Sequence, residues 1–101
     1  MLAVYGGAAL SPVGSLSPAG DGRWGQADLA GNVWEWNLDE YAVGGSYFNP
    51  CNDCENTTGI GPVARGGAWD SQASSLLAAA RYTFGIAGRF GDVGARCARV
   101  P

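Results

Sequence analysis

The chain contains no histidine and no lysine. The missing histidine removes the commonest general base and the commonest transition-metal ligand from any mechanism. With six arginines and a net charge of −3, the sequence predicts no basic patch that would bind nucleic acid or an anionic membrane. Residues 1–10 are weakly apolar, lack a positively charged start and are too short to cross a bilayer, so neither a signal peptide nor a membrane segment is expected. The sequence does not predict the cellular compartment of the protein.

Long apolar runs are also missing. Seventeen glycines and five prolines interrupt them, which argues against long helices and favours short strands joined by tight turns. The composition is nevertheless 47% hydrophobic with four tryptophans, enough for a chain of 101 residues to bury a modest core. The sequence therefore predicts a single α+β domain over residues 1–101, made mostly of short β-strands and irregular loops.

The pattern along the chain predicts strands at 2–5, 33–38, 63–69 with a break at Gly66–Gly67, and a closing strand at 93–100. Residues 74–81 have helix-forming side chains but no convincing cap, so propensity alone favours a short helix there.

Residues 44–61 form a polar insertion, which is longer than most connections and is therefore either stapled or mobile. It contains Cys51 and Cys54. A structural zinc needs four ligands, and the chain offers no histidine and one further cysteine. A redox pair usually lies at a helix N-terminus, whereas this pair follows Pro50 in a loop. A disulfide that staples the loop is the favoured interpretation in an oxidising compartment.

Trp34, Trp36 and Trp69 are most simply core residues, and a carbohydrate-stacking platform is the rival interpretation. The arginines are expected to form exposed ion pairs with acidic side chains, a type of interaction that contributes little to stability. These expected partners are Arg65, Arg81, Arg89 and Arg96 on one side and Asp39, Glu40, Asp70 and Asp92 on the other. A glycosylation sequon at 56–58 carries no sign of use.

Four motifs occur in order: PVGS at 12–15, AGNVWEW at 30–36, RGGAW at 65–69 and VGARC at 93–97. Together they resemble the formylglycine-generating enzyme, or sulfatase-modifying factor, family. The resemblance covers residues 12–100. It implies a C-type-lectin-like fold that is truncated at its N-terminus, and a strand in place of the helix at 74–81. It also implies apolar surface left by the missing half, and hence self-association or a protein partner.

The resemblance also implies a calcium ion held by the segment 28–35. Its ligands would be the side chain of Asp28, the main-chain carbonyls of Gly31 and Val33, and the carboxylate of Glu35. Calcium prefers such hard oxygen ligands. The alternative is that Asp28 caps a turn and Glu35 pairs with an arginine on the strand surface.

In the family's oxidases, a cysteine pair that binds copper lies between the motifs matching residues 65–67 and 79–81. Here the interval 68–78 has no cysteine, and its serines cannot replace soft thiolates as Cu(I) ligands. The resemblance therefore implies a chain without formylglycine-generating activity or copper, a pseudoenzyme; whether it catalyses anything else stays open. Cys97 matches a position that often pairs with a cysteine of the missing half, so it is expected to be free and buried.

A second function of the same fold is ligand display. Residues 70–92 resemble the diversified region of retroelement-mutated variable proteins, and sister genes that differ in that stretch would favour this alternative. The binding face would comprise Trp69, Asp70, Tyr82, Phe84 and Phe90. A third function, an oxidoreductase of the ergothioneine-pathway type, needs histidine iron ligands that only a partner chain could supply.

Overall fold

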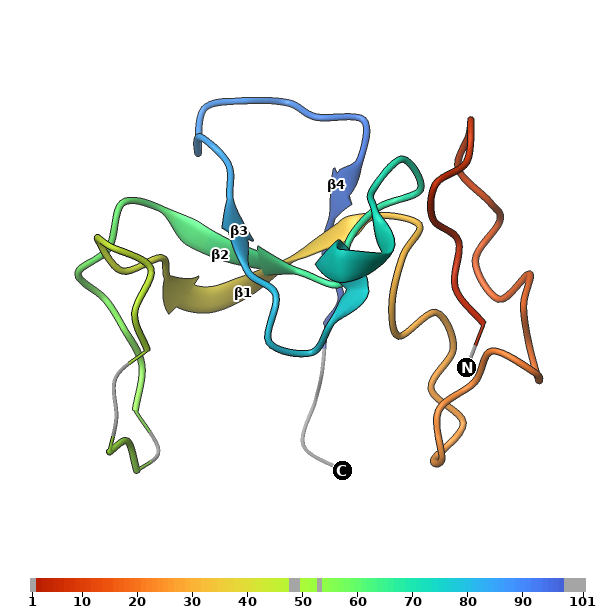
Figure 1. Ribbon diagram of the computed structural model, residues 1–101, viewed down its shortest axis with the longest axis horizontal. Helices are drawn as coiled ribbons and strands as arrows, with labels where there is room; N and C mark the ends of the chain where they lie inside the picture. Colours follow the sequence, from red (N-terminus) through yellow and green to blue (C-terminus); the bar gives the residue numbers. More distant parts are fainter. Residues whose placement is uncertain (1, 48–49, 53, 98–101) are drawn as a thin grey trace.

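The computed structural model of the protein describes residues 2–47, 50–52 and 54–97. The chain forms few regular elements there, joined by irregular segments (Figure 1). The elements are strands β1 (Trp34–Glu40), β2 (Pro62–Arg65), β3 (Tyr82–Thr83) and β4 (Val93–Gly94), and the 3-10 helix η1 (Ala73–Leu76). The helical part of the expected α+β fold is thus limited, in the described residues, to one short turn.

The strands form one mixed sheet in the order β3-β2-β1-β4. β1 runs antiparallel to β2, with Glu35 opposite Arg65, and parallel to β4, with Trp34 opposite Val93. A register shift interrupts the pairing of β1 with β2 after Trp36. The sheet therefore joins three of the four sequence motifs, and it places Glu35 between β2 and β4.

The buried core is small and is centred on Trp34, which is 8% exposed. It packs with Ala64 and Ala68, two residues without exposed surface whose small side chains leave room for the indole. Large aromatics bury about 150–250 Å² each and so dominate the apolar burial of a domain of this size. Partly buried residues that pack against this cluster are Trp36, Trp69, Phe84 and Val93. The prediction of a core residue is confirmed for Trp34, while Trp36 and Trp69 are partly buried against that core.

The turn before β1 fastens the N-terminal segment to the sheet. The Gly31 amide donates to the Gly66 carbonyl over 2.7 Å, and the Asn32 amide donates to the Val4 carbonyl over 2.8 Å. The Asn32 side chain both accepts from the Ser11 amide and donates to the Ser11 carbonyl. Gly31 and Asn32 have φ of +79° and +69°, in the left-handed region that glycine and asparagine adopt most readily. The Gly-Asn pair is thus required by the backbone.

The structure corrects the expectation for residues 74–81. They form neither the strand implied by the resemblance nor a full helix: η1 ends at Leu76, and β3 begins at Tyr82. η1 is short because Gln72, at its N-cap, makes no side-chain capping hydrogen bond, and Leu77 is already extended.

Two terminal strands are shorter than expected. The strand expected over 2–5 is reduced to a single bridge between Val4 and Gly31. The closing strand extends over Val93–Gly94 only, because the chain after it turns so that Arg96 reaches β1. Residues 98–100 of that expectation lie outside the described residues.

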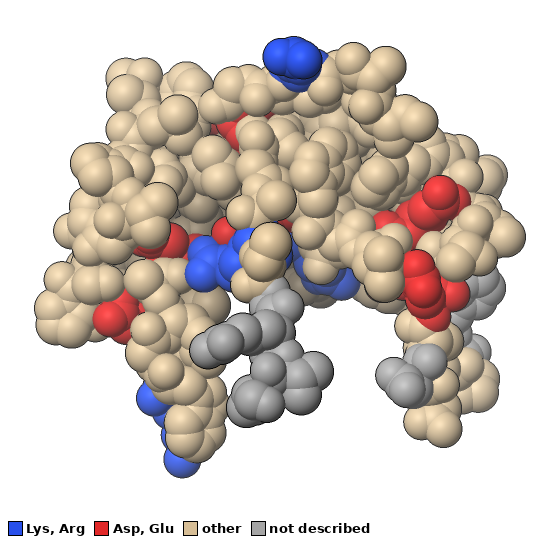
Figure 2. All heavy atoms as spheres, turned by 180° about the vertical axis from the view of Figure 1, so that it is seen from behind, with Lys and Arg blue, Asp and Glu red and all other residues tan. Residues whose placement is uncertain are grey.

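The N-terminal segment and the loop at 44–61 lie at opposite ends of the sheet (Figure 1). Seen from behind, arginine side chains lie near the middle of the molecule and acidic side chains lie to either side (Figure 2). Among the described residues, no helix has the length and apolar character needed to cross a membrane.

Replacing Gly31 with alanine should destabilise the fold more than the same change at Gly44. Both glycines have positive φ, at +79° and +83°, so each variant incurs the cost of a left-handed alanine, about 1–2 kcal/mol. A Cβ at Gly31 would meet the Val4 carbonyl oxygen at 2.2 Å, whereas a Cβ at Gly44 would meet nothing within 4 Å. We expect Gly31→Ala to lose a further ~1–3 kcal/mol in urea unfolding. Equal losses would contradict the close approach of Val4.

Candidate functional site

The four residues expected to bind calcium line one cavity of about 290 Å³, together with Asn32 and Arg96. Asp28 reaches it from a turn in which its own φ is +53°. Glu35 reaches it from β1. The structure thus brings Asp28, Gly31, Val33 and Glu35 together around one cavity.

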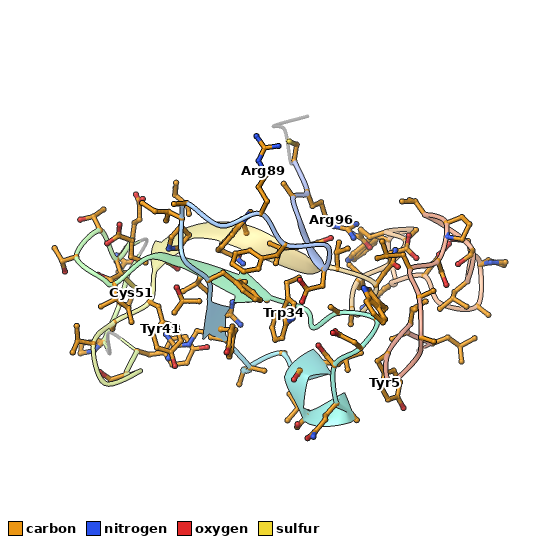
Figure 3. All side chains as sticks on the ribbon, turned by 90° about the horizontal axis from the view of Figure 1, so that it is seen from above. Tyr5, Trp34, Tyr41, Cys51, Arg89 and Arg96 are labelled. Atoms are coloured by element: carbon orange, nitrogen blue, oxygen red, sulfur yellow. A yellow bond between two sulfur atoms is a disulfide. The ribbon has the colours of Figure 1, made fainter. Side chains whose placement is uncertain are left out.

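Arg96 holds the oxygens of this cavity. Its Nε donates to both carboxylate oxygens of Glu35, over 2.9 and 3.1 Å. Its two terminal nitrogens donate to main-chain carbonyls, that of Ala27 over 2.9 Å and that of Asp28 over 2.6 Å. One guanidinium therefore lies among four oxygens, which we call the oxygen cage. Figure 3 shows Arg96 between the sheet and the N-terminal loops.

The electrostatics of the cage favour a cation. The hydrogen bond to Glu35 is the main cause that raises the pKa of Arg96 above its ordinary value, and the charges of Glu35 and Asp28 act in the same direction. Partial burial acts against them. Arg96 therefore stays charged at any physiological pH.

The donors of this cavity suit a hard cation such as calcium, because they are carboxylate and carbonyl oxygens on an irregular turn. Two of the expected ligands accept hydrogen bonds from main-chain amides: an Asp28 carboxylate oxygen accepts from the Gly14 amide over 2.6 Å, and the Gly31 carbonyl accepts from the Val33 amide over 2.9 Å. Among the described residues no three acidic or cysteine side chains gather as a metal site, so main-chain carbonyls must contribute.

The disulfide loop lies at the other end of the sheet. Cys51 and Cys54 form a disulfide that lines a small cavity with Tyr47, Arg65 and Arg81. In Figure 3 Cys51 lies beside Tyr41, at the end of the molecule away from Arg96. The bond closes a short stretch within the insertion at 44–61.

Arginine–tyrosine contacts, which the sequence did not predict, tie this loop to the sheet. The Arg81 guanidinium lies 3.4 Å from the centre of the Tyr47 ring and donates to the Gly45 carbonyl. Arg65 donates to the Tyr47 hydroxyl over 3.0 Å and to the Ala78 carbonyl over 2.5 Å. Such stacking on an aromatic face is favourable for a guanidinium. No local sequence pattern signals a contact between residues so far apart.

The ion pairs expected for the arginines are wrong in their partners. In the described residues the one salt bridge joins Arg96 to Glu35, and none of Arg65, Arg81 and Arg89 pairs with a carboxylate. The carboxylates of Asp39 and Glu40 accept main-chain amides of the loop, those of Asn56 and Gly59 respectively. Because main-chain amides of the loop already donate to the carboxylates of Asp39 and Glu40, these carboxylates have hydrogen-bond partners without an arginine.

The sequon asparagine is buried. Asn56 is 8% exposed, its Nδ2 donates to the Glu40 carbonyl over 2.7 Å, and its Oδ1 accepts from the Thr58 amide and hydroxyl. Its side chain therefore has the structural role of bracing the end of the loop against β1.

The residues of the expected binding face have different surroundings. Tyr82, Phe84 and Phe90 come together, with ring centres 5.0 Å apart at each step. Trp69 packs, as Phe84 does, against the Trp34 core, and the Trp69 amide donates to the Asn32 carbonyl. Asp70 lies exposed in the turn that follows.

Cys97 is free, as expected, but it is exposed and not buried. It follows Arg96 directly, and the side chain of Arg96 points into the oxygen cage. Because Arg96 is drawn towards Glu35, the next residue is left on the surface.

The chain matches the family described as the sulfatase-modifying factor enzyme 1-like domain over residues 5–101. It is 36% identical over 92 residues to the formylglycine-generating enzyme of Streptomyces coelicolor, a match that covers 87% of this chain and 28% of that protein. No solved structure matches. The few short strands and near absence of helix agree with a portion of such a domain. The chain belongs to the sulfatase-modifying factor enzyme 1-like family.

Proposed function

We propose that this chain is a sulfatase-modifying-factor segment that does not itself oxidise cysteine. The observation that carries the proposal is the placement of its thiols. Copper-based oxidation needs soft thiolates that converge on one Cu(I), and the interval 68–78 supplies none. Cys51 and Cys54 are bonded to each other in the loop, and Cys97 stands next to the oxygen cage.

Assayed with copper, oxygen and a cysteine-containing peptide of the sulfatase type, the purified chain should form no formylglycine above a blank without protein. The Streptomyces coelicolor enzyme named above serves as the positive control. Mass spectrometry of the peptide measures the product. The assay should be run with the Cys51–Cys54 bond intact and again after reduction, since reduction exposes the remaining candidate thiol pair. Product under either condition would overturn the proposal.

The same proposal includes a calcium ion at the cavity of Asp28, Gly31, Val33 and Glu35. The support is that all four residues line one cavity and offer hard oxygens. Calcium bound there would supply positive charge that links the turn to β1. Asp28 and Glu35 would orient it, while Gly31 provides the left-handed backbone that turns carbonyls towards the cavity.

Calcium should raise the unfolding temperature of the wild-type chain and leave Glu35→Gln unchanged. At a free calcium concentration of 100 times the dissociation constant, the gain is about 2.7 kcal/mol. For a domain of this size each kcal/mol is worth about 4–8 °C. Asp70→Asn is the matched control, because it removes one exposed carboxylate away from the cavity. Titration calorimetry measures the affinity, and binding retained by Glu35→Gln would refute the assignment of this ligand.

We also propose that the chain associates with a second copy through apolar surface. The support is the contrast between four buried apolar residues in the core and large exposed ones, which include Val13, Trp24, Leu38 and Ile86, each at least 77% exposed. Exposed apolar side chains favour an interface where they gather into one contiguous patch.

Light scattering over a range of concentrations should show a mass above that of the 10.4 kDa monomer, and Leu38→Ser should shift the equilibrium towards the monomer. Leu38 is chosen because its side chain is 80% exposed on β1 and is not needed by the core. A monomer at every concentration would exclude self-association.

A further inference from the structure

We propose that Arg96 is a built-in competitor for the calcium site, so that a divalent cation and the Arg96 guanidinium bind the Glu35 carboxylate in alternation. The inference rests on the calcium site proposed above, and it adds a consequence for residues 95–97. Where the guanidinium is bound, these residues are held against the segment at 27–28. Where the cation is bound, they are released.

The geometry sets the two occupants in competition. Both carboxylate oxygens of Glu35 accept from Arg96, at 2.9 and 3.1 Å, and the nearest contact of a terminal nitrogen with Glu35 is 2.8 Å. A calcium ion needs those oxygens at about 2.3–2.6 Å. A calcium ion on this carboxylate would therefore lie close to the guanidinium, and repulsion between the two positive charges disfavours binding both at once.

Charge gives a divalent cation its advantage. Asp28 and Glu35 contribute two negative charges to the cavity, and Arg96 neutralises one. A divalent ion neutralises both, so the exchange removes a residual negative charge that the guanidinium leaves. Separating Arg96 from Glu35 also costs little free energy, because the Arg96 side chain is 41% exposed and a charged group near water is readily rehydrated.

Release of Arg96 from Glu35 would free one part of the chain and leave β4 in place. Arg96 links Glu35 to the carbonyls of Ala27 and Asp28, two residues that precede Arg96 by more than 60 positions. β4 itself stays paired with β1, because the Trp34 amide donates to the Asp92 carbonyl over 2.7 Å. Among the described residues, the part that gains freedom is therefore 95–97, which includes the exposed Cys97.

The test compares wild type with Arg96→Gln and with Arg89→Gln. Arg89→Gln makes the same change in net charge at an exposed residue outside the cage. Calcium calorimetry should show roughly two- to fivefold tighter binding for Arg96→Gln, the factor expected for loss of an exposed ion pair, and no change for Arg89→Gln. A nitroxide on Cys97, with the Cys51–Cys54 disulfide intact, should become more mobile when calcium is added to the wild type.

In Arg96→Gln the same label should be mobile without calcium and should not respond to it. Equal calcium affinity in all three proteins, with an unchanged label, would overturn the competition while the calcium site itself stood. No calcium binding in any of the three would overturn both. Binding by Arg96→Gln but not by the wild type would support the competition and show that the guanidinium prevails.

Discussion

The hydrogen bonds around Gly31 and Asn32 are the constraint on which the rest of the molecule depends. Asn32 uses its amide on Val4, its side chain on Ser11 and its carbonyl on the Trp69 amide. The turn thereby fastens the N-terminal segment and the chain after β2 to the start of β1. It also sets the direction of Glu35. A polar side chain whose groups are all paired in this way specifies one arrangement, since an unpaired buried group is costly.

Arginine side chains connect segments that apolar packing would hold together in a protein with a larger core. Arg96 reaches carbonyls at 27 and 28, Arg65 reaches the one at 78, and Arg81 reaches the one at 45. Each contact joins segments far apart in sequence. A planar guanidinium with five donors can do this, whereas a lysine offers a single point charge. The absence of lysine from the chain is consistent with this use of arginine.

The sequence predicted β1, β2, the tryptophan core and the family, because each depends on a local pattern or on an ordered set of motifs. It did not predict η1, for which weak propensity and an implied strand were both poor guides. Nor did it predict the Arg81–Tyr47 stack or the exposure of Cys97. These features follow from contacts between distant residues, and composition and spacing carry no information about such pairings.

Two interpretations of Glu35 were alternatives at the level of sequence: a metal ligand, or an acid paired with an arginine. The structure has the arginine pair, at Arg96, and it also has the lining residues that a metal would use. These two interpretations conflict only if Glu35 always has the same partner. Because both would use the same carboxylate oxygens, they are the two occupants that we propose for one cavity. In this proposal Glu35, on β1, connects cation binding to the position of residues 95–97.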